Sequence, residues 1–136
     1  MEEINRMAKK LDLFNLQVNN LLESLYKTFP HLTHIGVLQS QLEIALMINP
    51  RRVYTGFSKY VYPHKEEIMN KNEVYFLEDN VEVKEDYLSS ALKLKELWIT
   101  ELSKENKETV WSYLQVLIVL AEQIMKEDGR VKPAVI

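Results

Sequence analysis

The chain contains no cysteine among its 136 residues. Disulfide bonds, a catalytic thiolate and cysteine-ligated zinc are therefore excluded. Glycine and proline are also scarce, at three and four residues, so the sequence predicts few turns and long uninterrupted elements. So few glycines leave little room for a phosphate-binding loop, and neither a dinucleotide-binding nor a P-loop nor a nucleophile-elbow motif occurs.

Long hydrophobic runs are missing as well. The longest apolar stretch, residues 116–121, is far shorter than the roughly 20 residues that span a bilayer. The N-terminus has no basic segment followed by an apolar one, Glu2 excludes myristoylation, and the C-terminus has no cysteine to prenylate. We therefore expect an intracellular protein without membrane contact. A net charge of −3 argues against broad, charge-driven binding to nucleic acid.

What the sequence does have is typical of a globular helical protein. Hydrophobic residues make up 46% and charged residues 27% of the chain, and the length suits one domain. The patterns below predict an all-α, single-domain bundle of about five or six helices around a buried C-terminal helix. We expect the helical domain to span residues 1–129 and the tail, residues 130–136, to be flexible because Pro133 interrupts any helical pattern.

The first predicted helix runs from Glu2 to Thr28 and ends before Pro30. Leu13 and Leu16 fall off its main apolar stripe, so this helix either contacts two neighbours inside the domain or projects as a coiled-coil arm. The stripe repeats every three or four residues, as one face of a helix requires; its members are Ile4, Met7, Leu11, Phe14, Val18, Leu21, Leu22, Leu25 and Phe29.

Two further helices are predicted before residue 70. The second has Thr33 as its N-cap and ends near Asn49, where Asn49 and Pro50 form an N-cap and first-turn pair for the third. Pro63 ends or kinks this third helix. The buried face of the second helix is predicted to consist of Ile35, Leu38, Leu42, Leu46 and Met47.

The second half of the chain holds an acidic loop and two helices. We expect a surface loop over residues 78–84 and a helix over residues 85–102. Ser103 is the predicted N-cap of a last helix, residues 104–127, and Gly129 its terminating glycine. This last helix is apolar nearly all round, which predicts a central, buried element.

Candidate catalytic groups are few. His31 and His34 stand at i,i+3 spacing and His64 stands alone, but no carboxylate completes a metal-binding motif such as HExxH. The paired carboxylates at residues 66–67, 78–79 and 85–86 lie in charged stretches, where a solvated surface is a simpler interpretation than a catalytic pair. We therefore predict no catalytic, metal or cofactor-binding residues and interpret the chain as non-enzymatic.

Residues 51–65 are the candidate for nucleic-acid binding. Cations that neutralise phosphates and aromatic rings that stack on bases alternate here. The simpler alternative is an amphipathic helix that buries its aromatic residues, and we favour it. The candidate residues are Arg51, Arg52, Lys59 and Lys65, with Tyr54 and Tyr60 between them.

Two apolar features could instead bind a protein partner. Leu13 and Leu16 would form a second face on the first helix, and Val131, Val135 and Ile136 would allow the tail to add a strand or fill a groove. Packing within the molecule is the alternative for the helix, and disorder for the tail.

Residues 102–117, LSKENKETVWSYLQVL, carry one distinctive pattern. It resembles a run in small, uncharacterised, all-helical proteins of nucleocytoplasmic large DNA viruses, including relatives from algal and giant viruses. Phe29-Pro30, Asn49-Pro50 and residues 68–73 are similar to further features of that group. The residues that match the run are Ser103, Lys107, Val110, Trp111, Tyr113, Leu114 and Gln115.

This resemblance implies a viral origin and an all-helical fold, with a location in the host cytoplasm, the virus factory or the virion. The group lends no catalytic residues. Our leading hypothesis is therefore a non-enzymatic helical module that binds another protein or itself, with a homodimer as one expected form. The alternative is a nucleic-acid-associated protein that uses residues 51–65.

Overall fold

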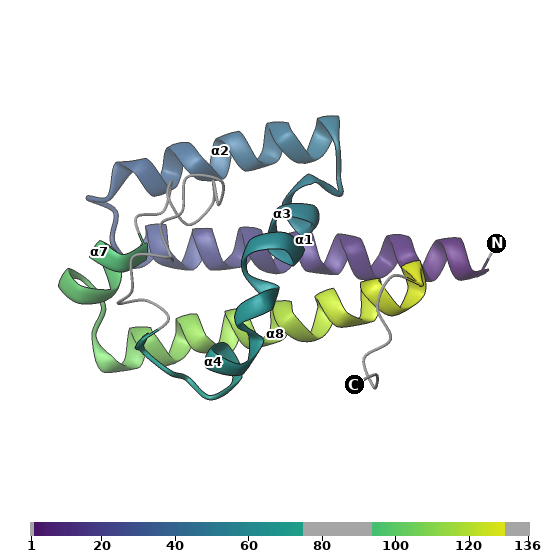
Figure 1. The fold of residues 1–136 in the computed structure, drawn as a ribbon. Coiled ribbons are helices and arrows are strands. Elements are labelled where there is room, and N and C mark those ends of the chain that lie inside the picture. The colour runs from purple at the N-terminus through teal and green to yellow at the C-terminus, as the bar shows by residue number, and fades with distance from the viewer. Residues whose placement is uncertain (1, 75–93, 130–136) are drawn as a thin grey trace.

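The computed structural model describes residues 2–74 and 94–129, and within these ranges every regular element is a helix. The all-α, single-domain prediction is therefore confirmed for the described residues. The long helices lie roughly in a row, with shorter ones crossing them (Figure 1). Their bounds are α1 Glu2–Thr28, α2 Thr33–Ile48, α3 Arg52–Tyr60, the 3₁₀ helix η1 Tyr62–His64, α4 Lys65–Met69, α7 Leu94–Thr100 and α8 Lys104–Asp128.

Helix α1 has the predicted bounds and lies between α2 and α8 (Figure 1). It is antiparallel to both, and a salt bridge of 2.8 Å from Lys10 to Glu127 joins its first half to the end of α8. The predicted stripe is buried from Leu11 to Leu25. Since α1 packs against α2, α3 and α8, it lies inside the bundle and does not project as an arm.

The starts of α2 and α3 differ from the prediction. Leu32 is the N-cap of α2, without a side-chain hydrogen bond, and Thr33 is already the first helical residue. Helix α3 begins at Arg52 with Arg51 as its N-cap. Asn49 accepts a hydrogen bond of 3.0 Å on its Oδ1 from the Arg51 backbone N–H, a side-chain turn that competes with N-capping. A helix boundary near Asn49 and Pro50 was correctly predicted, but the N-cap of α3 lies two residues later than predicted, at Arg51.

Pro63 has the predicted effect. Helix α3 ends at Tyr60, η1 carries Pro63 in its first turn, and α4 follows directly. Proline fits there because the first turn of a helix leaves its backbone N–H groups unused. Together α3, η1 and α4 form a segment that crosses α1 from the end of α2 to α8 (Figure 1).

Both ends of α8 follow the sequence signals. Ser103 accepts a hydrogen bond of 3.1 Å from the Asn106 backbone N–H, and Gly129 has the left-handed conformation, with φ of 71°. Nine residues of α8 are buried, in agreement with the buried C-terminal helix predicted from the sequence. Val116 and Val119 are nevertheless exposed on its outward face, so α8 is covered on its inner sides only.

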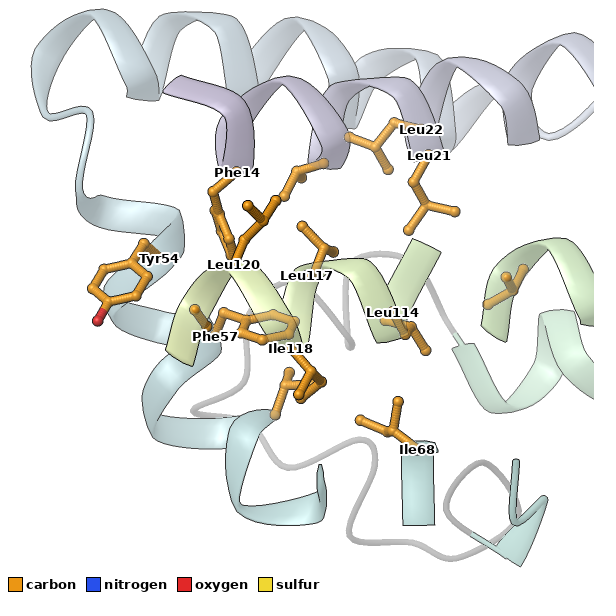
Figure 2. Packing of buried hydrophobic residues seen from close by; sticks show 14 of the residues in the cluster. Phe14, Leu21, Leu22, Tyr54, Phe57, Ile68, Leu114, Leu117, Ile118 and Leu120 are labelled. Carbon is orange, nitrogen blue, oxygen red and sulfur yellow. The ribbon is translucent and has the colours of Figure 1, made fainter. Parts of the chain in front are cut away.

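The core is shared by residues from nearly the whole described chain. Figure 2 shows Phe14 of α1, Phe57 of α3 and the α8 residues Leu117 and Leu120 gathered in one cluster. The Phe14 ring meets Tyr54 and Phe57 edge-on, at centroid distances of 5.7 and 5.2 Å, an arrangement that aromatic pairs prefer. At the other end Trp98 of α7 packs on Trp111 of α8 at 5.1 Å.

Three predictions concern residues outside the described ranges. They are the surface loop at residues 78–84, the first half of the helix predicted for residues 85–102, and the tail with Val131, Val135 and Ile136. The second half of that helix is α7, which ends two residues earlier than predicted, at Thr100.

Candidate interaction surfaces

The outward face of α2 is strongly apolar and open to solvent. Its buried face, with Ile35, Leu38 and Leu42, packs toward α1 and α3. Glu43 is the one acidic or basic residue in the sixteen of this helix, apart from His34. The large apolar side chains on the outward face are Val37, Ile44, Met47 and Ile48, which are 57%, 60%, 85% and 78% exposed. We call these four residues the α2 stripe.

The sequence placed Met47 on the buried face, and this was wrong. Helix α2 is apolar around most of its circumference, so its periodicity predicts two apolar faces and does not say which one is covered. The packing against α1 covers the side of Ile35 and Leu38 and leaves Met47 outside. The only sequence feature that indicated an exposed apolar side of α2 was the near absence of charge over residues 33–48.

Leu13 and Leu16 of α1 form a second, smaller apolar surface. They lie off the main stripe and are 43% and 52% exposed, so they do not pack against a second neighbour inside the described part of the domain. Neighbouring positions of α1 are polar, with Lys9 and Asp12 both exposed. Two leucines among charged residues are common on the surface of a monomeric protein, so this pair alone does not identify an interface.

A third apolar surface is a shallow hollow on the outside of α8, of about 410 Å³. Gln115 forms one side of it and donates hydrogen bonds of 3.2 Å to the carbonyl oxygens of Ile68 and Met69. This side chain thereby satisfies the end of α4. The hollow is wide open and mostly apolar; its lining residues are Met69, Ser112, Gln115, Val116, Val119 and Leu120.

The cations of residues 51–65 are largely engaged within the molecule. Arg51 donates to Asp128 of α8 at 2.6 Å and lies over the Tyr54 ring at 5.2 Å from its centroid. Tyr54 itself is fully buried, so its ring is not available to stack on a base. Lys59 lies over the ring of Tyr60 at 5.0 Å.

Lys65 and Tyr62 both bind the same carboxylate, that of Glu122 in α8. Burial, together with the hydrogen bond to Glu122, raises the pKa of Tyr62 to about 12. Burial alone would raise the pKa of Glu122, but hydrogen bonds from Lys65 and Tyr62 and the charges of Lys65 and Lys126 outweigh it, so that this pKa is lowered. The three side chains join η1 and α4 to α8.

Of the four candidate cations, Arg52 and Lys59 are thus the exposed ones, whereas Arg51 and Lys65 are half-buried and form ion pairs with α8. The structure therefore does not bring the four predicted cations together into one solvent-facing patch. Two of them hold the α3–α4 segment against α8.

The residues of the Ser103–Gln115 run have structural roles. Trp111 is buried against Trp98, whose ring nitrogen donates to Glu73 at 3.1 Å. Lys107 lies over the Trp98 ring at 5.2 Å and reaches the same Glu73 oxygen at 3.4 Å. Together with Gln115, which bonds to the end of α4, these side chains hold α4, α7 and α8 together.

The histidines do not form a site. His31 pairs with Glu101 at 2.9 Å, in an exposed position. Over residues 2–74 and 94–129 there is no group of three side chains suited to hold a metal ion. Nor does this part of the chain contain a helix long and apolar enough to cross a membrane.

Comparisons with known protein families, with curated proteins and with solved structures found no match to this chain.

Proposed function

We propose that this protein is a non-enzymatic helical module that binds another protein, or a second copy of itself, through the α2 stripe. The observation that carries the proposal is the exposure of four large apolar side chains on a nearly uncharged helix. Isolated surface leucines are ordinary, but a contiguous apolar patch of on the order of 500 Å² is as large as the largest patch on a typical monomeric protein, and such patches are often functional. Side chains exposed to this extent on one helix amount to about that area.

The internal packing supports the same proposal. Helix α2 already has a complete buried face of Ile35, Leu38 and Leu42, so the stripe is not needed to attach it to α1 and α3. If α2 only had to pack against α1 and α3, its outward side would be expected to be polar. The viral origin implied by the Trp111–Gln115 run belongs to this proposal and rests on that resemblance.

Nucleic-acid binding is less well supported. Arg51 and Lys65 pair with carboxylates of α8, and Tyr54 is buried. Neutralised cations release few counterions from a phosphate backbone, so they contribute little affinity. We therefore treat nucleic acid as an outcome of the test and not as a second proposal.

The test is affinity capture from cells that express the protein, with and without nuclease, using three charged variants. Ile44→Glu disrupts the α2 stripe, Leu16→Glu the α1 surface, and Val119→Glu the α8 hollow. All three positions are exposed, so each variant is expected to change the unfolding free energy by only about 0.5 kcal/mol. We expect protein partners that survive nuclease and are lost from the Ile44→Glu variant alone.

Partners that are retained equally by the Ile44→Glu variant would contradict the proposal. Loss from the Leu16→Glu variant would move the interface to α1, and partners that disappear with nuclease would favour the nucleic-acid alternative. Circular dichroism of each variant checks that its helices are intact.

A further inference from the structure

The α2 stripe has properties that suit contact with an identical surface. Its four apolar members carry no charge, although the chain as a whole has a net charge of −3. Two copies can therefore meet along the line of Val37, Ile44 and Ile48 without bringing like charges into the middle of the contact, which would otherwise oppose self-association. A partner selected by charge would need complementary groups on the stripe, and there are none.

Glu43, the one acidic residue of α2, lies to the side of the proposed contact. Successive residues of an α-helix are about 100° apart, which places Glu43 roughly 120° around α2 from the line of Val37, Ile44 and Ile48. The Glu43 carboxylate therefore lies outside a contact centred on that line, although it borders Met47, which follows four residues later on the same side of α2. Ser40 and Gln41, the other polar neighbours of the stripe, are uncharged.

The surface is also accessible to a second helix. In Figure 1 α2 lies at the edge of the row of long helices, with α1 on one side of it. The stripe is a ridge on a straight helix, and identical ridges can pack into each other's grooves across a twofold axis. Antiparallel pairing is favoured because it brings opposite ends of the two helix dipoles together.

We propose that α2 pairs with α2 of a second copy of this chain, antiparallel, about a twofold axis near Ile44. With the axis near Ile44, Met47 and Ile48 of one copy lie opposite residues 41 and 40 of the other, so this register covers the two most exposed side chains of both copies. Val37 then lies beyond the end of the partner's α2, which stops at Ile48. The inference rests on the proposed function, and names a second copy as the partner. Two stripes bury about 1,000 Å² together, near the lower limit for a specific interface, which corresponds to a dimer that dissociates on dilution.

Two measurements test the pairing. In sedimentation, the apparent mass of 16.1 kDa at low micromolar concentration should approach twice that value at several hundred micromolar. The Ile44→Glu variant should raise the dissociation constant at least tenfold, whereas Leu16→Glu and Val119→Glu should leave it within twofold. A wild-type protein that stays monomeric throughout would overturn the proposal.

The absence of cysteine allows a direct test of the register. A single Ile44→Cys substitution should form a crosslinked dimer on mild oxidation, since disulfides require Cα atoms within about 7 Å. The Val37→Cys variant should not, because antiparallel pairing separates the two copies of residue 37 by about 20 Å along the helix. Val119→Cys on α8 is the control for random collision.

Equal crosslinking at residues 37 and 44 would mean parallel pairing and would overturn the proposal, as would crosslinking no faster than at residue 119. These outcomes differ from failure of the proposed function. If the chain stays monomeric while Ile44→Glu still abolishes capture of another protein, the α2 stripe binds a different partner and only the self-pairing is wrong. If Ile44→Glu changes neither readout, both proposals fail.

Discussion

Glu122 connects three elements through a single carboxylate. It accepts hydrogen bonds from Tyr62 and Lys65, and its lowered pKa means that the folded protein favours the ionised form. Lys65 and Glu122 are 57 positions apart in the sequence, which contains many other acidic residues, so no local pattern could identify this pair. The same holds for Arg51 and Asp128, which are 77 residues apart.

Glu122 should contribute a pH-dependent part of the stability. A carboxyl group with a lowered folded pKa stabilises the protein above its unfolded pKa, near 4.5, and this stabilisation is lost as the pH falls through the folded pKa. We expect Glu122→Gln to lower the unfolding free energy at pH 7 by on the order of 1 kcal/mol, allowing for solvent screening. The difference between wild type and variant should shrink below about pH 4.5 in urea titrations.

Tyr62 gives a second pH-dependent contribution to stability, which is lost as the pH rises and not as it falls. The raised pKa of Tyr62 means that its contribution is present below pH 10 and is lost as the pH rises from 10 to about 12. Tyr62→Phe should remove one late step from the tyrosinate absorbance titration of the folded protein. An unchanged titration would show that Tyr62 is not held by Glu122.

At the scale of the helix, sequence signals predicted boundaries better than faces. The bounds of α1, the Ser103 cap and the Gly129 terminus were correct because each depends on residues within one turn. The outward side of α2 was not predictable in the same way. Whether Met47 or Leu38 is covered depends on where α1 and α3 lie, and that is a tertiary property.

The two helical glycines differ in their surroundings, and this gives a prediction about substitution. A Cβ at Gly56 of α3 would meet nothing within 4 Å, so Gly56→Ala should raise the unfolding free energy by about 1 kcal/mol through helix propensity. A Cβ at Gly36 of α2 would lie 2.9 Å from the Tyr26 ring. Gly36→Ala should therefore gain clearly less, or destabilise, because the ring must shift. Thermal unfolding of both variants compares them; an equal gain would mean that the Tyr26 ring moves freely.

For the whole molecule, the core is continuous from α1 through α3 and α4 to α8 (Figure 2). The sequence predicted its main residues from α1 and α8, because their apolar spacing is regular. It could not predict that the short α3–α4 segment crosses α1, since that arrangement depends on contacts between residues far apart in the chain. The candidate site was the weaker part: Leu13 and Leu16, named as a candidate interface, are about half exposed, but the larger α2 stripe was missed.

The continuity of this core can be measured with two substitutions in one helix. Phe14 is fully buried against Tyr54 and Phe57, whereas Leu16 is half exposed. Phe14→Ala should lower the unfolding free energy by about 3–5 kcal/mol, a large part of the total for a domain of this size. Leu16→Ala should cost less than about 1 kcal/mol. Similar losses in chemical denaturation would mean that α1 is buried differently from the arrangement described here.

The near absence of charge in α2 has a practical side. No lysine or arginine occurs between Lys27 and Arg51, so trypsin releases the whole helix within a single peptide. Reagents that couple to amines, and enzymes that attach acetyl groups or ubiquitin to lysine, find no target on this helix. In a dimer formed through α2, lysine crosslinkers would therefore react only with residues outside the contact. The helix itself would not be a direct target of regulation by lysine modification.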